Sequence, residues 1–170
     1  MKIIGALFIL ATTSLLGFEY ARRLQERTKQ LRLLRTALIS LEAEIMFGHA
    51  PLHEASRRIA RQIANPIGEL FDTFADHLIQ RDIRAKEAWE FSLQEIWKKT
   101  ALKKAELDIL LQFGENLGRH DLEQQQKQIR LALTHLEREE KEAEEIQKSY
   151  GRMYRSLGIL AGLLLTLLLV

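Results

Sequence analysis

Both ends of the chain are apolar, and this feature constrains the fold more than any other. Ile3 to Phe18 are almost entirely apolar, and residues 157–170 contain no charged side chain. Each stretch is shorter than the roughly 20 residues that a helix needs to cross a hydrocarbon layer about 30 Å thick. We therefore expect membrane anchors at residues 1–20 and 156–170, which need flanking residues, local bilayer thinning or neighbouring helices to span the membrane.

The first apolar stretch could instead be a cleaved secretory signal, since Met1-Lys2 precedes it. No small-x-small cleavage site follows the stretch, however, and six basic residues lie just beyond it: Arg22, Arg23, Arg27, Lys29, Arg32 and Arg35. Lys148, Arg152 and Arg155 likewise precede the second stretch. Because positive charge stays on the cytoplasmic side of a membrane, this pattern favours two uncleaved anchors around a cytoplasmic domain of residues 21–155.

Charge and cysteine content exclude several classes of protein. The chain has no cysteine, so it can form no disulfide, thiolate nucleophile or cysteine zinc site. The net charge of +2 is too small to indicate a nucleic-acid-binding protein. Since the basic residues cluster beside the apolar ends, the partner that they favour is the lipid bilayer, through its anionic headgroups.

The central domain is predicted to be helical throughout, because glycine and proline are sparse and no alternating β-branched run occurs. Apolar residues recur at three- and four-residue steps along the first helix, at Leu31, Leu34, Leu38, Leu41 and Ile45. We predict an all-α bundle of about six helices, with transmembrane helices continuous with the first and last of them. Helix ends are expected near Gly48, Thr100 and Gly118, and helix starts at Pro51, Asn65-Pro66 and Asp121; one helix ends and the next begins within residues 80–85. Asp121 and Gln124 form a capping-box pattern at the start of the last helix.

Two other patterns in these helices are interpreted as structural. The run Glu137 to Glu142 is typical of a solvated face, with Glu137 paired to Lys141 one helical turn away. Trp89 and Trp97 lie two turns apart on one face of the fourth helix, which favours a bundle core over a ligand cage.

The sequence offers little for catalysis. His49 and His53 stand four residues apart, like the start of a helical metal site, but Pro51 between them indicates a helix that begins only after His49. We find no glycine-rich phosphate loop, nucleophile elbow or spaced carboxylate pair. We therefore expect no catalytic, cofactor-binding or metal-binding residues, and no enzyme activity.

Two glycine pairs are candidate interaction sites. Gly158 and Gly162 form a small-xxx-small step that would let two membrane helices approach closely, although glycine is also simply frequent in such helices. Gly114 and Gly118 predict a tight turn, but a turn alone does not require Glu115 between them.

The chain also resembles a known family over its whole length, including both anchors. Segments at residues 41–45, 51–55, 114–118 and 157–158 resemble the stage III sporulation protein AB family of endospore-forming bacteria. That family is similar in turn to the cytoplasmic helical domain of the inner-membrane platform protein of type II secretion and type IV pilus machines. Residues 48–55 match its Gly-x-Pro-Leu-x-x-Ala stretch with one extra residue, and Gly114 to Gly118 match its Gly-Glu-x-x-Gly turn.

The resemblance implies a scaffold in the channel complex between mother cell and forespore, where it would couple a secretion-type ATPase in the mother-cell cytoplasm to other sporulation channel proteins. The expected location is the mother-cell membrane that faces the forespore. Pro51, Leu52, Gly114, Glu115 and Gly118 are the candidate contact or shape-setting residues. Platform proteins usually carry two copies of the helical domain, so a chain with one copy is expected to form homo-oligomers. The alternative is a freestanding membrane-anchored coiled-coil tether with no ATPase partner.

Overall fold

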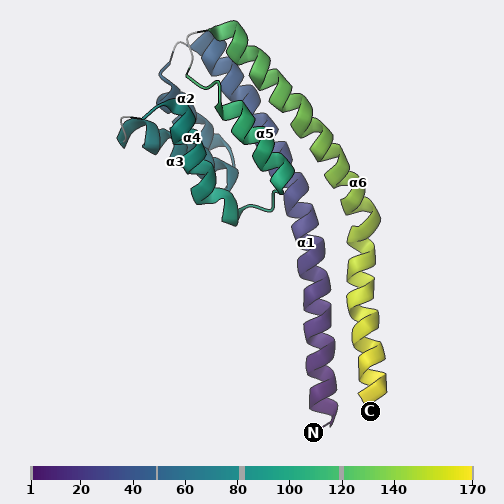
Figure 1. Ribbon diagram of the computed structural model, residues 1–170. Helices are drawn as coiled ribbons and strands as arrows, with labels where there is room; N and C mark the ends of the chain where they lie inside the picture. Colours follow the sequence, from purple (N-terminus) through teal and green to yellow (C-terminus); the bar gives the residue numbers. More distant parts are fainter. Residues whose placement is uncertain (1, 49, 81–82, 119–120, 170) are drawn as a thin grey trace. The chain divides into compact units, whose positions relative to one another are not determined.

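The computed structural model describes residues 2–48, 50–80, 83–118 and 121–169, with the backbone alone at most positions in 2–14 and 151–169. Within these ranges the chain forms six α-helices and no strand, which confirms the predicted all-α class (Figure 1). The helices are α1 (Lys2–Ala43), α2 (Leu52–Gln62), α3 (Ile67–Gln80), α4 (Ala85–Ile96), α5 (Lys104–Gly114) and α6 (Leu122–Leu169). A π-helical turn, Glu44–Gly48, extends α1, and a 3-10 turn, Trp97–Lys99, extends α4.

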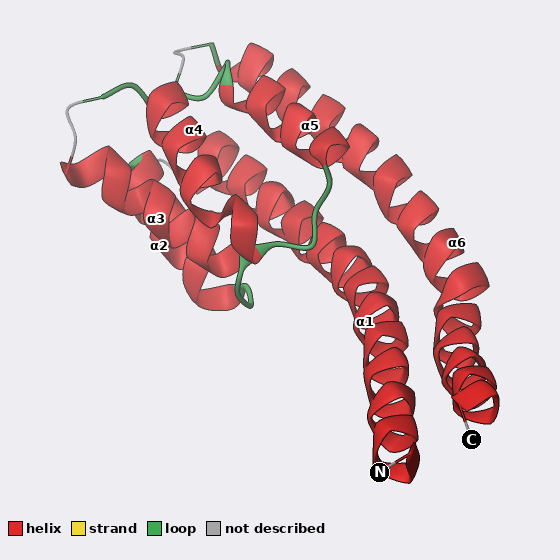
Figure 2. Ribbon diagram, turned by 60° about the horizontal axis from the view of Figure 1, so that its bottom comes forward, coloured by secondary structure: helices red, strands yellow, loops and turns green. Residues whose placement is uncertain are grey.

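The chain divides into two compact units, and α1 and α6 contribute to both. The first unit comprises Met1–Thr28 and Lys141–Val170, and the second comprises Lys29–Glu140. In the first unit the start of α1 and the end of α6 run side by side in both ribbon views (Figures 1 and 2). Four apolar side chains on this part of α1 are between 50% and 70% exposed: Leu15, Leu16, Phe18 and Tyr20.

The two expected anchors fall largely on positions whose side chains are outside the described set. Among the residues that are described, no helix combines the length and the hydropathy needed to cross a membrane.

The second unit is a helical body with its own core. Consecutive helices from α2 to α5 pack against one another, and α1 and α6 complete the body (Figure 2). The leucine stripe predicted for the first helix is fully buried at Leu31, Leu34, Leu38 and Leu41. On the part of α6 that belongs to this unit, the buried apolar residues are Ile129, Ala132 and Leu136, which also recur at three- and four-residue steps.

An aromatic cluster fills the centre of the second unit. The ring of Trp89 on α4 meets Phe71 and Phe74 on α3 and Phe113 on α5 edge-on, at centroid distances of 5.6, 5.1 and 5.4 Å. Edge-to-face pairs of this kind add about 0.5–1.5 kcal/mol each to the free energy gained by burial. The prediction that Trp89 belongs to a bundle core is confirmed, whereas Trp97 is only half-buried.

Ion pairs tie the outer helices of this unit together. The Arg57 guanidinium of α2 lies 2.8 Å from Asp72 and 2.5 Å from Asp76 of α3, and these hydrogen bonds raise the pKa of Arg57. Arg58 binds Glu44 at 2.6 Å and so links α2 to the π-helical turn. These pairs are partly exposed, so we assign them to orientation of the helices more than to stability.

The helix starts follow the predicted signals with small differences. Pro51 occupies the N-cap of α2 and not its first turn, and its carbonyl accepts hydrogen bonds from the backbone N–H groups of Glu54 and Ala55. The Asp121 carboxylate accepts the N–H of Gln124 at 3.1 Å, as the capping pattern predicts. α5 ends at Gly114, earlier than expected, because the chain already turns between Gly114 and Gly118.

Candidate functional site

The turn after α5 is built against α4, which the sequence did not indicate. Gly114 is the last residue of α5 and is buried. A Cβ atom at Gly114 would collide with Cδ1 of Trp89 and lie 3.3 Å from its Cγ. The Trp89 indole N–H donates a 2.8 Å hydrogen bond to the carbonyl of Leu110, one turn earlier on α5. Gly114 therefore makes room for the indole ring that bonds this helix.

Gly118 is needed at its position for two reasons. Its φ angle is +76°, in the left-handed region that favours glycine. A Cβ atom there would lie 2.9 Å from the Cβ of Ala85 at the start of α4. Both glycines of the Gly-Glu-x-x-Gly turn thus have a structural explanation within the fold.

Glu115 differs from the two glycines because its side chain reaches the surface. Its carboxylate lies 2.7 Å from the Lys86 ammonium and is about 50% exposed. The hydrogen bond from Lys86 to Glu115 raises the pKa of Lys86. Lys86 also lies 3.8 Å from Glu90 on its own helix. The turn and the start of α4 therefore share a partly exposed, charged surface, which we call the α4–turn surface, formed by Lys86, Glu90 and Glu115.

Pro51 and Leu52 occupy a second location in the same unit. Pro51 is exposed, Leu52 is half-buried, and the Leu52 carbonyl accepts a 2.8 Å hydrogen bond from the hydroxyl of Ser56. Phe47, in the π-helical turn just before them, is 79% exposed. Among the described contacts, no hydrogen bond or ion pair joins Pro51 or Leu52 to the Gly114–Gly118 turn, so the two candidate positions remain separate.

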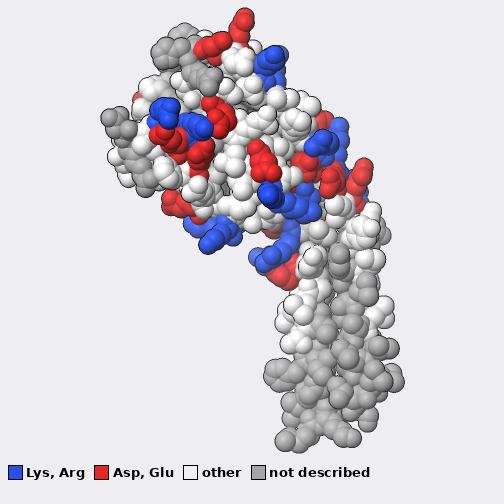
Figure 3. All heavy atoms as spheres, in the orientation of Figure 1, with Lys and Arg blue, Asp and Glu red and all other residues white. Residues whose placement is uncertain are grey.

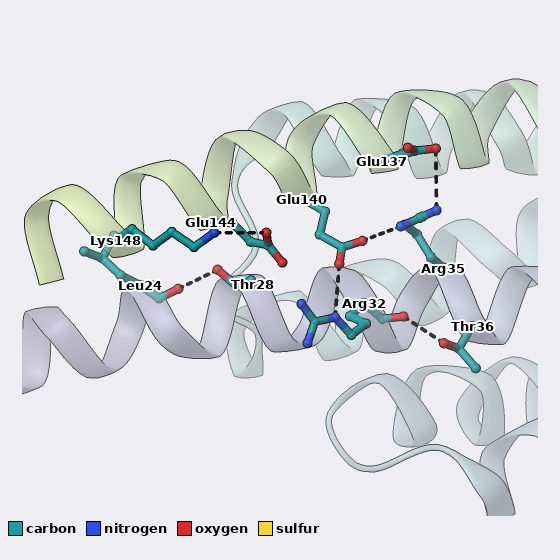
Figure 4. Close-up of polar contacts among 9 residues, drawn as sticks. All are labelled: Leu24, Thr28, Arg32, Arg35, Thr36, Glu137, Glu140, Glu144 and Lys148. Atoms are coloured by element: carbon teal, nitrogen blue, oxygen red, sulfur yellow. Dashed lines mark hydrogen bonds and ion pairs between the residues drawn. The ribbon is translucent and has the colours of Figure 1, made fainter.

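A polar clasp between α1 and α6 was missed by the sequence reasoning. The Glu140 carboxylate binds the Arg32 Nε at 3.1 Å and the Arg35 Nη1 at 2.6 Å (Figure 4). Glu137 lies 3.6 Å from Arg35. We call these four residues the Arg–Glu clasp. A second polar contact joins the same two helices. Glu42 of α1 accepts hydrogen bonds from two residues of α6, Gln126 at 2.9 Å and Arg130 at 3.1 Å.

The clasp corrects one interpretation of the sequence. The run Glu137 to Glu142 was expected to form a solvated face, but Glu139 and Glu140 are buried, with 6% and 7% of their surface exposed. The reason is that Glu140 lies one turn from each of Leu136 and Ala143, which are also buried, on the side of α6 that packs on α1. Arginines on α1 supply the charges that make burial of a carboxylate tolerable.

The remaining expectations concern residues that the structure does not fully describe. Gly158 and Gly162 lie within α6, but the packing at both positions is outside the described residues. His49 is also outside them, so the His49–His53 pair is not defined. In the part of the chain that is described, no group of three or more His, Asp or Glu side chains is placed to hold a metal ion.

Comparisons with known proteins agree on one family. The family described as Stage III sporulation protein AB (spore_III_AB) matches residues 2–170. The chain is 54% identical to Stage III sporulation protein AB of Bacillus subtilis (strain 168), over 100% of this chain and 99% of that protein. A solved structure of Stage III sporulation protein AB is similar with a TM-score of 0.70 and 55% identity, over 73% of this chain and 98% of the solved one.

Proposed function

Because this chain belongs to the stage III sporulation protein AB family, we propose that it serves sporulation as a non-enzymatic membrane platform. The resemblance predicted from the sequence is confirmed, and the matched relatives are named as sporulation proteins and not as enzymes. In this proposal residues 1–20 and 156–170 anchor the chain in the mother-cell membrane that faces the forespore. The domain between them couples a secretion-type ATPase in the cytoplasm to membrane components of the channel complex.

The observation that carries the proposal is the Arg–Glu clasp. α1 and α6 each continue from a terminal apolar stretch into the second unit, where Arg32 and Arg35 hold Glu140. The clasp fixes the register of the two helices on which both anchors are carried. A displacement applied to the helical body would therefore move α1 and α6 together instead of sliding one past the other.

The exposed apolar residues at the start of α1 support the anchoring part of the proposal. Leu15, Leu16 and Phe18 present apolar side chains outward from the described part of the first unit. Large exposed apolar side chains that lie this close together in the sequence are unfavourable in water and favour contact with lipid or another protein.

The body formed by α2 to α5 favours a platform over a simple tether. A tether needs only two paired helices, whereas this chain adds four helices with an aromatic core around Trp89. The α4–turn surface lies on this added body and gives an ATPase a charged surface to contact. We propose this surface as the motor-facing contact, with Glu115 as its most exposed residue.

The experiment that tests this function compares three strains of the source bacterium. One lacks the gene, one carries Glu115→Lys, and one carries Glu142→Lys, a matched reversal at an exposed position of α6 with no described contact. Late forespore gene expression and forespore size after engulfment are scored in each. We expect arrest in the deletion and in Glu115→Lys, with Glu142→Lys close to wild type.

Immunoblotting and co-purification of the ATPase separate loss of contact from loss of protein. Normal amounts of a Glu115→Lys protein that no longer co-purifies with the ATPase would support the coupling role. Normal spores in the deletion strain would refute the platform. Unchanged localisation and oligomeric state in cells that lack the ATPase would favour the freestanding tether. Cross-linking in intact membranes tests the proposed homo-oligomer, which a strictly monomeric pattern would contradict.

A further inference from the structure

The connection between α4 and α5 carries a concentrated positive charge. Lys98, Lys99, Lys103 and Lys104 fall within seven residues that contain no acidic side chain, and all four lysines are exposed. Lys and Arg side chains gather on the surface of the second unit over the end of α4 and the start of α5 (Figure 3). We call these four residues the lysine loop.

The charge of the lysine loop is mostly uncompensated. Lys99 forms an ion pair with Glu69 of α3, but no ion pair involves Lys98, Lys103 or Lys104 among the described contacts. Glu106, the nearest acidic residue along the chain, is fully buried, and its carboxylate accepts the backbone N–H of Lys103 at 2.6 Å. The nearest acidic group is therefore used inside the protein, and three ammonium groups face outward.

A buried side chain of α1 holds the lysine loop in place. The Gln30 side-chain carbonyl accepts the backbone N–H of Ala101 at 2.7 Å, and Gln30 is 4% exposed. Gln30 follows Tyr20, where the proposed N-terminal anchor ends, by ten positions. Ten residues span about 15 Å as a helix, and at most about 35 Å when fully extended. The length of chain between the anchor and Gln30 therefore permits the lysine loop to reach a bilayer that holds the anchor.

We propose that the lysine loop is a docking surface for anionic lipid headgroups. This inference rests on the proposed membrane anchoring and adds to it a second, electrostatic contact made by the helical body. A lysine near an anionic membrane surface changes the binding equilibrium on the order of fivefold, and the attraction decays within a Debye length. Three uncompensated lysines would hold the body against an anionic surface at physiological salt and release it at high salt.

The test uses the full chain in lipid nanodiscs. Because the sequence has no cysteine, Ala105→Cys introduces a unique thiol beside the lysine loop, at an exposed position of α5. A fluorophore is attached to this thiol, and a quencher is attached to a constant fraction of the lipid headgroups. The loss of fluorescence then measures how much of the protein has its lysine loop at the membrane surface. Nanodiscs of phosphatidylcholine alone are compared with nanodiscs that also contain phosphatidylglycerol.

The charge dependence is measured with two double variants that change the net charge equally. Lys98→Glu with Lys104→Glu removes charge from the lysine loop, and Arg61→Glu with Lys127→Glu removes it at exposed positions elsewhere. We expect strong quenching only in nanodiscs that contain phosphatidylglycerol. In those nanodiscs the Lys98→Glu, Lys104→Glu variant should show at least a fivefold smaller fraction of chains with the loop at the membrane. The Arg61→Glu, Lys127→Glu control should change this fraction little. Raising the salt to about 0.5 M should release the wild-type loop.

The outcomes separate this inference from the proposal that it rests on. A chain that does not co-purify with nanodiscs would refute the anchoring, and the docking surface with it. A chain that is incorporated but shows equal quenching in both lipids, or equal effects of both double variants, would overturn the docking surface alone. A loop that stays in solution, while its charge reversal still blocks sporulation, would assign the lysines to an acidic protein partner instead.

Discussion

Substitution of Glu140 by Gln isolates the charge of the Arg–Glu clasp without changing its shape. The Glu140 side chain is 9% exposed, that of Arg35 is 29% exposed and that of Arg32 is 63% exposed. Breaking a buried ion pair costs about 3–5 kcal/mol, and breaking an exposed pair costs at most about 1 kcal/mol. Since the clasp lies between these limits, we expect Glu140→Gln to lower the free energy of unfolding by about 2 kcal/mol. Most of this loss should come from Arg35, whose Nε is already buried without a hydrogen-bond partner.

Urea unfolding of the full chain in detergent, followed by tryptophan fluorescence, measures this loss because Trp89 lies in the core of the same unit. Glu142→Gln is the matched control, since Glu142 is exposed on the same helix, and should change stability by less than about 0.5 kcal/mol. Arg35→Gln and the double variant complete a cycle, which should return a coupling energy of about 1 kcal/mol or more. If Glu140→Gln unfolds at the same urea concentration as Glu142→Gln, the clasp does not hold the two helices.

Substitutions at the three positions Gly114, Gly118 and Glu115 test the turn after α5. Gly114→Ala should lower the free energy of unfolding by about 1–3 kcal/mol, because the new methyl group overlaps the Trp89 indole; near-wild-type stability by urea unfolding would contradict this. Gly118→Ala should cost about 1–2 kcal/mol for its left-handed backbone, with Gly118→Asn less harmful, and equal losses for both would argue against the backbone explanation. Glu115→Lys should lower the urea midpoint slightly, and adding Lys86→Glu should restore it; a double variant no better than the single one would disprove the Lys86–Glu115 pair.

Local patterns predicted the helices well, for identifiable physical reasons. A 3.6-residue period places Leu31, Leu34 and Leu38 on one face whatever they pack against, so the buried stripe of α1 could be predicted without knowledge of its partner. Pro51 and Asp121 act on backbone groups within four residues of themselves, so the starts of α2 and α6 were also predictable.

The contacts between helices were not predictable in the same way. Gly114 was recognised as a turn residue, but its reason for being glycine is Trp89, a residue on another helix. Glu140 was assigned to a solvated face because it lies in a run of charges. The sequence did contain a signal for burial, because Glu140 lies one helical turn from the apolar residues Leu136 and Ala143. The sequence did not show why a carboxylate occupies that position, which is explained by the arginines of α1.

The wide sequence separation of the clasp also has a consequence for synthesis of the chain. Arg32 and Glu140 are 108 residues apart, whereas Arg57 and Asp72 are 15 apart and Trp89 and Leu110 are 21 apart. The ribosome needs roughly 5–20 s to add the residues between Arg32 and Glu140. During that interval α2 to α4 can already assemble through their local contacts, but Arg32, Arg35 and Glu42 of α1 have no α6 to bind. The last helix to be made is therefore the one that completes the polar contacts of the first. An interrupted chain would also lack the buried residues Ile129, Ala132 and Leu136 of α6, and the apolar surface that they cover would be open to aggregation.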